Sequence, residues 1–335
     1  MLKTRNKPNR TSLAVINLKN SPDINSIEFD LIENGLDFVL SSLNPIVKST
    51  NQHDLKYSIL HLSAGTELIL KERLRREHWT LIFNKTDSAN LNGLKSGDFQ
   101  SVNLDNLLNR LENICEIQFE DSEKKYLKEL KKRRNRIEHF EFKENDTAIK
   151  SLTSKVLSVI FTFIQEHFPR DTLTKNSQNQ ITELRKKIAD FDEFTEFRLI
   201  QISKVIEKES KDHHIIECPA CYQHAFVLKD KLTCLFCGYS DDPETVAIEY
   251  IENILDINAY YEIKSGGYFP LEECFECEEE TMVDNREDFI CFSCHSKWSR
   301  ADVLECGGCA DLFLRDEDTF MNICDACMRH RIEKF

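Results

Sequence analysis

An arginine, an asparagine and a histidine stand close together near the middle of the chain. They are Arg134, Asn135 and His139, in the order Arg-Asn-x3-His. Arginine presents a fork of N–H donors that can grip a phosphate group. Histidine is the side chain best matched to proton transfer near neutral pH. Together these residue types suggest cleavage of RNA.

The segment that carries this motif predicts a strongly basic helix over 122–139. Its lysines and arginines form a ridge that can steer phosphates, and the alternative is an ordinary solvated helix face. The same Arg-x4-His spacing occurs at Arg73 and His78, so the bare spacing does not define a site. The residues expected to hold the flanking phosphates of an RNA are Lys131, Lys132, Arg133 and Arg136.

Apolar residues at helical spacing predict a bundle of four or five helices between Pro22 and Pro169. Residues 175–211 carry a narrow apolar stripe, which predicts a connecting helix that either spaces the domains or docks against the bundle. The helices expected in the bundle lie near 27–43, 54–83, 104–115, 122–139 and 149–168.

The motif at 134–139 and the helical layout of roughly 22–168 resemble the HEPN superfamily. Its members are small helical bundles that bear Arg-x4–6-His, commonly with a polar residue after the arginine. The resemblance implies a metal-independent endoribonuclease whose active site combines two copies of the motif across a homodimer. Many relatives are toxins or defence effectors, and others are inert.

The same resemblance implies a role for each residue of the motif. His139 would act as general acid or base toward the RNA 2′-hydroxyl or the leaving 5′-oxygen. Arg134 would stabilise the charge that develops in the transition state. Asn135 would position either His139 or Arg134. Cleavage through the 2′-hydroxyl would leave a 2′,3′-cyclic phosphate and would spare DNA.

Twelve of the thirteen cysteines form six Cys-x-x-Cys pairs, which favours metal ligation in a reducing compartment over disulfides. Taken in sequential couples, the pairs are separated by 12, 13 and 14 residues, as suits a β-hairpin that completes a tetrahedral four-cysteine site. The sequence therefore predicts three structural zinc sites with no open position for catalysis. A cross-braced pairing of the last eight cysteines stays open. The predicted ligands are Cys218, Cys221, Cys234, Cys237, Cys274, Cys277, Cys291, Cys294, Cys306, Cys309, Cys324 and Cys327.

Charge is divided unevenly along the chain. Residues 1–170 carry 26 basic and 23 acidic side chains (+3), and residues 171–335 carry 18 and 35 (−17), which gives −14 in total. The acidic segment 272–280 disfavours a nucleic-acid backbone there, so a protein partner or self-association is expected. No apolar stretch approaches the roughly 18–20 uninterrupted residues of a membrane span. We expect a soluble, cytoplasmic protein that does not bind membranes.

The sequence thus predicts a mainly α-helical N-terminal bundle, a helical linker and small β-rich zinc-ribbon modules. The leading functional prediction is a HEPN-like endoribonuclease whose ribbons regulate or target it. The alternative is a non-catalytic dimerisation scaffold whose ribbons bind protein or nucleic acid. The expected units are a flexible tail (1–20), the bundle (21–170), the linker (171–212), the first ribbon (213–257) and the second and third ribbons (258–335).

Overall fold

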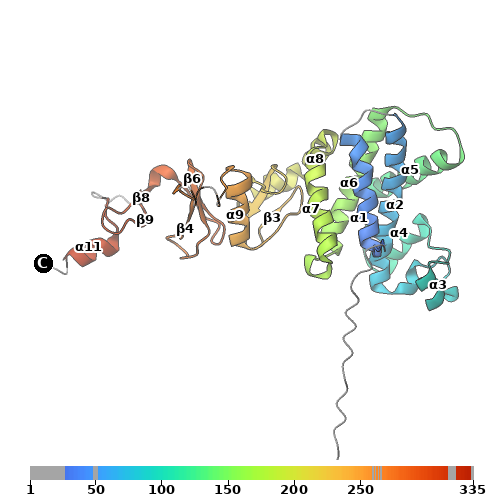
Figure 1. Cartoon of the computed structure of the whole chain (residues 1–335), viewed down its shortest axis with the longest axis horizontal. Coiled ribbons are helices and arrows are strands. Elements are labelled where there is room, and N and C mark those ends of the chain that lie inside the picture. Colours follow the sequence, from blue (N-terminus) through green and yellow to red (C-terminus); the bar gives the residue numbers. More distant parts are fainter. Residues whose placement is uncertain are drawn as a thin grey trace, which may run out of the picture.

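The chain folds into a helical body followed by small antiparallel sheets that lead toward the C-terminus (Figure 1). This arrangement confirms the predicted fold class. The predicted tail at 1–20 lies outside the described residues. The computed structural model describes residues 27–47, 52–258, 260, 262, 264, 266–315 and 322–332.

The first two helices of the body, α1 (Leu31–Val47) and α2 (Gln52–Glu77), cross at two glycines. A Cβ on Gly65 would lie 2.7 Å from the carbonyl oxygen of Gly35 and 2.7 Å from Cγ2 of Val39. The two backbones can approach this closely only because glycine has no side chain. This contact sets the distance between the two helices.

The long helix α2 ends earlier than the predicted boundary at residue 83. His78 adopts an extended backbone, and its side chain accepts a hydrogen bond from the backbone N–H of Thr80. This contact caps a 3₁₀ turn, η1 (Trp79–Ile82), and so separates the turn from α2. Arg110 fixes the turn further by donating to the carbonyls of Phe83 (2.6 Å), Asn84 (2.9 Å) and Leu81.

Polar caps begin the other helices of the body. Asn103 and Asn145 cap the helices that follow them, and Glu120 forms a reciprocal capping box with Glu123. The remaining elements of the bundle are η2 (Thr86–Ser88), α3 (Leu91–Ser96), α4 (Leu104–Asn113), α5 (Asp121–His139), α6 (Asp146–His167) and η3 (Arg170–Thr172).

Helix α6 is the central core helix. It is long and apolar enough to cross a membrane by length and composition, and it is the one such helix among the described residues. However, 67% of its apolar window is buried inside the protein. This burial is the pattern of a core helix that is covered by its neighbours.

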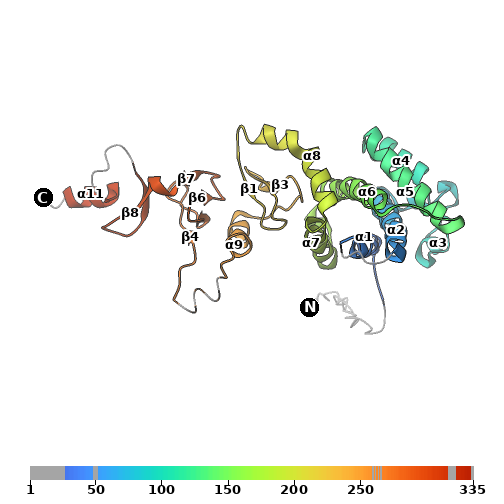
Figure 2. The same cartoon turned by 90° about the horizontal axis from the view of Figure 1, so that it is seen from above.

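The segment predicted to connect the domains forms two helices, α7 (Lys175–Ala189) and α8 (Asp192–Glu209). Helix α7 packs against α1, and α8 packs against α6, as the view in Figure 2 also shows. Thr174 caps α7 and donates a hydrogen bond of 2.6 Å to Glu33 of α1. Of the two roles considered for this segment, the structure shows docking.

Three short antiparallel sheets carry the cysteine pairs, and helix α9 (Pro243–Asn253) lies between the first two sheets in sequence. The strands of the first sheet are β1 (His214–Glu217), β2 (His224–Leu228) and β3 (Thr233–Cys234). Those of the second are β4 (Leu271–Glu272), β5 (Met282–Asp284), β6 (Asp288–Cys291) and β7 (Lys297–Ser299). The turn η4 (Arg300–Asp302) leads to β8 (Val303–Glu305), β9 (Leu312–Leu314) and the last helix, α11 (Asp325–Ile332).

One apolar core runs from the helical body through the first sheet and into the second. Phe194 of α8 meets Phe236 of the first sheet region with ring centroids 5.7 Å apart. Tyr250 of α9 meets Phe292 beside the second sheet at 5.5 Å. A smaller cluster of buried residues lies between the second and third sheets. The first sheet is therefore packed as part of the body.

We predict that Gly65→Ala destabilises the body by about 1–3 kcal/mol, because its Cβ would overlap the backbone of α1. Urea unfolding followed by circular dichroism measures the change. Asn109→Ala, at an exposed position of α4, should change the free energy of unfolding by less than about 0.5 kcal/mol. Equal stability of the Gly65→Ala variant and wild type would contradict the close crossing.

Candidate metal centres and candidate active site

Three groups of four cysteines converge in the C-terminal part of the chain, and we name them the first, second and third clusters. In each group the four sulfur atoms all lie within 4.8 Å of one another. The last eight cysteines pair sequentially, so cross-bracing does not occur. The clusters are Cys218, Cys221, Cys234 and Cys237; Cys274, Cys277, Cys291 and Cys294; and Cys306, Cys309, Cys324 and Cys327.

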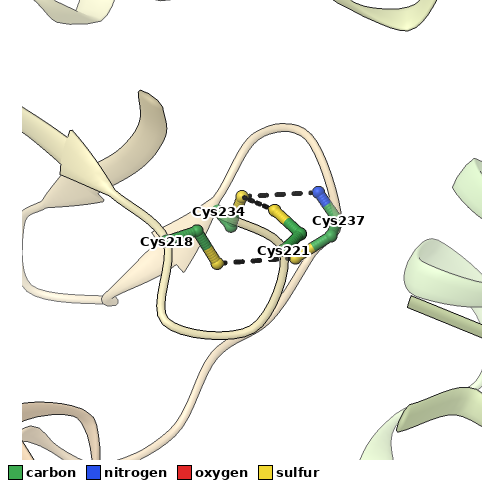
Figure 3. Close-up of side chains that lie close together, drawn as sticks. All are labelled: Cys218, Cys221, Cys234 and Cys237. Atoms are coloured by element: carbon green, nitrogen blue, oxygen red, sulfur yellow. Dashed lines mark hydrogen bonds between the residues drawn. The ribbon is translucent and has the colours of Figure 1, made fainter. Parts of the chain in front are cut away.

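The spacing of the sulfurs fits a tetrahedral metal site. In the first cluster the Sγ atoms of Cys218 and Cys237 lie 3.6 Å apart, and those of Cys221 and Cys234 lie 3.8 Å apart (Figure 3). Four sulfurs about 2.3 Å from a zinc ion have edges of about 3.8 Å. A disulfide would require about 2.05 Å, and all twelve cysteines are free thiols. The clusters could thus hold metal ions, consistent with zinc sites.

Backbone N–H groups point at the sulfurs within the Cys-x-x-Cys turns. Cys218 Sγ accepts from the N–H of Ala220, and Cys234 Sγ accepts from the N–H of Cys237, both at 3.4 Å. The other clusters repeat this geometry, for example from Cys294 N–H to Cys291 Sγ. Hydrogen bonds of this kind favour the ionised thiolate, which is the form that binds metal.

The three clusters differ in their exposure to solvent. All four cysteines of the first cluster are buried, and the second cluster mixes buried and half-buried side chains. In the third cluster Cys309 is exposed, and Cys324 and Cys327 are half-buried. The third cluster is therefore the most accessible to a chelator or an oxidant.

The Arg-Asn-x3-His motif occupies the C-terminal part of α5. Arg134 donates to Glu138 Oε2 (2.8 Å) and to Glu67 Oε1 of α2 (3.3 Å). Burial disfavours its charge, but these two carboxylates outweigh burial and raise the pKa of Arg134. The side chain of His139 is 66% exposed, and its Nε2 lies 4.0 Å from Glu138. Arg134 is thus held by the bundle, whereas the imidazole faces solvent.

Asn135 is exposed on the same helix, one turn before His139. Between these two described residues, no hydrogen bond joins the amide of Asn135 to the imidazole of His139. Both side chains nevertheless lie on the exposed side of α5, because residues four apart share a helix face.

Three of the four cations predicted to hold RNA phosphates are engaged in ion pairs. Lys131 pairs with Asp105 at 2.6 Å, and Arg133 and Arg136 share Glu144 at 3.4 and 3.5 Å. Their charges are therefore largely neutralised within the bundle.

Three exposed lysines of α5 are without an ion pair in the described part of the chain. They are Lys125, Lys128 and Lys132. Their spacing of three and four residues continues to Asn135 and His139, so all five lie along one exposed stripe of the helix. We name these five residues the lysine stripe. It extends over about 21 Å of the helix axis, at a rise of about 1.5 Å per residue.

The second Arg-x4-His pair has local structural roles. Arg73 forms an ion pair with Glu77 one turn away at 3.1 Å, and His78 caps the turn η1. Neither residue belongs to a lysine-rich helix face. Arg73 and His78 therefore serve as an internal comparison for the motif on α5.

Two arginines that the sequence motifs did not indicate lie beside the first cluster. Arg185 of α7 donates to the carbonyls of Cys237 (3.1 Å) and Gly238 (3.4 Å), and Arg198 of α8 is buried beside Phe236. The residue pattern of α8 does indicate that Arg198 is buried. Arg198 falls on the apolar stripe with Phe194 and Ile202, where a solvated arginine is not expected.

Comparison with protein-family models, curated proteins and solved structures found no match to this chain. Its sites are therefore interpreted from their own geometry.

We predict that a chelator removes metal from the third cluster first and from the first cluster last, in the order of decreasing exposure. Graded treatment with EDTA, alkylation with N-ethylmaleimide and peptide mapping would identify the cysteines released at each step. The four cysteines of the third cluster should be alkylated at the lowest chelator concentration. Simultaneous release of all three groups, or early alkylation of Cys218 and Cys221, would show that burial does not set the order.

Proposed function

We propose that the three clusters bind zinc as structural ions. Four cysteine ligands at tetrahedral spacing match the ligand set that zinc prefers in small folded modules. In the third sheet only Val303 of β8 and β9 is buried, so a bound ion would supply much of the folding energy of this module. With four protein ligands per ion, no position remains open for substrate.

The purified chain should contain three zinc ions, one for each cluster. Elemental analysis by mass spectrometry, with protein concentration from amino-acid analysis, measures the ratio. Cys306→Ser together with Cys309→Ser should lower it to two. A ratio near one, or iron in place of zinc, would overturn the assignment.

We propose further that the helical body is a metal-independent endoribonuclease of the HEPN type. The lysine stripe supports this proposal, because three lysines that form no ion pair with the described residues lead along α5 to Asn135 and the exposed His139. Unpaired cations in a row attract a polyanion, and an exposed imidazole at their end can reach its backbone. Many HEPN relatives are toxins or defence effectors, so we propose such a role in the cytoplasm.

In the proposed reaction an RNA 2′-oxygen attacks the adjacent phosphorus and the 5′-oxygen leaves. His139 removes the proton from the 2′-hydroxyl or supplies one to the leaving oxygen. Arg134 stabilises the charge on the phosphorus oxygens, in competition with Glu138. The products are a 2′,3′-cyclic phosphate and a free 5′-hydroxyl, and DNA is spared because it lacks the attacking hydroxyl.

One copy of the motif offers a single imidazole, whereas this reaction needs both a base and an acid. A homodimer that brings two α5 ends together would supply the second imidazole. The ring of Phe140, which follows His139 and is 80% exposed, offers an apolar surface beside the motif for such a contact.

The competing proposal is a non-catalytic dimerisation scaffold whose acidic C-terminal modules bind a protein partner. The two carboxylates on Arg134 favour it, because they neutralise the cation that the reaction would need. The two proposals differ in whether any RNA is cleaved.

We predict that His139→Ala and Arg134→Ala each slow RNA cleavage by about 10²–10⁴-fold, the usual contribution of a positioned proton-transfer group or charge-stabilising group. Cleavage of a fluorescent single-stranded RNA is followed in EDTA over a short assay. The matched control is Arg73→Ala with His78→Ala, which carries the same spacing outside α5. A substrate with 2′-deoxyribose at the cleaved position should be resistant.

Light scattering should give the mass of a dimer for the full chain.

If the control pair abolishes cleavage while the α5 variants retain it, the site is misassigned. If wild type cleaves no RNA, the scaffold proposal replaces the nuclease.

The lysine stripe gives a separate prediction about RNA binding. Replacing Lys125, Lys128 and Lys132 by Gln should weaken binding of single-stranded RNA and flatten its salt dependence. For single strands the slope of log K against log salt falls by about 0.7 per lost phosphate contact, or about 2 in total. The control replaces the ion-paired Lys131, Arg133 and Arg136 by Gln. Fluorescence anisotropy at several salt concentrations measures both, and equal slopes for the two triple variants would refute the stripe.

A further inference from the structure

Arg198 carries a positive charge into the interior of the protein. Its side chain projects from α8 toward α6 and the first cluster, and the residue is only 8% exposed. The guanidinium donates from Nη1 to Thr162 Oγ1 (2.9 Å) and Ser158 Oγ (3.2 Å). From Nε it donates to the carbonyl of Phe236 at 3.4 Å. All three acceptors are neutral.

A buried guanidinium is unfavourable unless a negative charge lies near it. Among the described residues no carboxylate forms an ion pair with Arg198. Burial lowers the pKa of Arg198, and the groups that oppose burial are Cys234, Glu166, Cys237 and Glu123, in that order. The side chain of Glu166 is 63% exposed, so water screens its charge. Glu123 is only half-buried, whereas Cys234 and Cys237 are 1% and 0% exposed. The first cluster is therefore the fully buried source of negative charge that acts on Arg198.

A divalent ion held by four thiolates leaves two net negative charges. Phe236 stands directly before Cys237, so its hydrogen bond to Arg198 places the guanidinium against the second cysteine pair of this cluster. We propose that the metal–thiolate centre of the first cluster is the counter-charge of Arg198. Arg198 is in turn a positioning residue that strengthens metal binding at this centre.

The same cysteine pair also contacts the two neighbouring helices. Arg185 of α7 holds the carbonyls of Cys237 and Gly238. Gly238 has a positive φ of 60°, and a Cβ there would lie 2.3 Å from the side-chain amide of Gln165 on α6. Metal binding at the first cluster and the packing of α6, α7 and α8 are therefore coupled.

The coupling should be confined to the first cluster. Within residues 271–315 and 322–332, no arginine donates a hydrogen bond to a Cys-x-x-Cys turn of the second or third cluster. This inference rests on the metal binding proposed above and does not depend on RNA cleavage.

The test compares the full-length wild type with Arg198→Met at a series of free zinc concentrations set by a chelator. Alkylation and peptide mapping report which cysteines lose their metal. We expect Cys218, Cys221, Cys234 and Cys237 to need about 10–100-fold more free zinc for protection in the variant, the usual effect of losing a partner of the metal ligands. The other eight cysteines should be unchanged. Arg198→Lys, which keeps the charge, should show a smaller shift.

The matched control is Arg110→Met. Arg110 also donates to three neutral carbonyls of the body, but it lies away from the clusters. Its loss should lower the melting temperature equally with and without zinc. By reciprocity, zinc removal should lower the melting temperature of wild type more than that of Arg198→Met.

The proposal is overturned if Arg198→Met leaves the zinc dependence of the first cluster unchanged, or if it lowers the melting temperature equally in both metal states. Should that variant fail to fold, hydrogen exchange of wild type decides. Protection of the α8 amides that persists after zinc leaves the first cluster would refute the coupling. Absence of any bound metal would instead refute the zinc assignment itself.

Discussion

A charge that is buried must be neutralised where it lies, because the protein interior cannot replace the hydration that the charge loses. The helical body meets this constraint with local ion pairs. Glu72 is 1% exposed, and it accepts hydrogen bonds from Arg75 at 2.6 and 2.9 Å and from Arg76 at 2.9 Å. Its position in turn ties the end of α2 to η3, since Arg76 also donates to Thr172.

The same constraint shapes the candidate active site. Glu67 lies between Lys71 and Arg134, which draws the motif arginine onto the bundle and leaves the imidazole of His139 outside. A cation that is already paired can act on a phosphate only if the phosphate competes with the carboxylates. The three lysines of the stripe form no ion pair with a carboxylate of the described residues. Charge pairing thus separates the cations that build the bundle from those available to a polyanion.

In the C-terminal part of the chain the cysteine sulfurs take the place of carboxylates as the buried groups that can carry negative charge. The second and third sheets share only a small apolar core, so their cysteine clusters supply stability that apolar packing does not. The first cluster differs from the other two because helices from the body surround it. The first cluster therefore connects the helical body to the sheets, because α7 and α8 pack against the body and also contact this cluster.

Spacing along the chain determined much of this protein. The apolar periodicity of 22–168 predicted the helical body, and the gaps between cysteine pairs predicted three four-sulfur clusters, because both patterns are local. The tertiary structure alone decided which charges are free. Lys131 and Lys132 are neighbours in sequence, yet within the described part of the chain only Lys131 forms an ion pair, with Asp105 of α4. The sequence likewise does not show that Arg198 is enclosed by α6 and the first cluster, because its burial and its counter-charge depend on residues far apart in the chain.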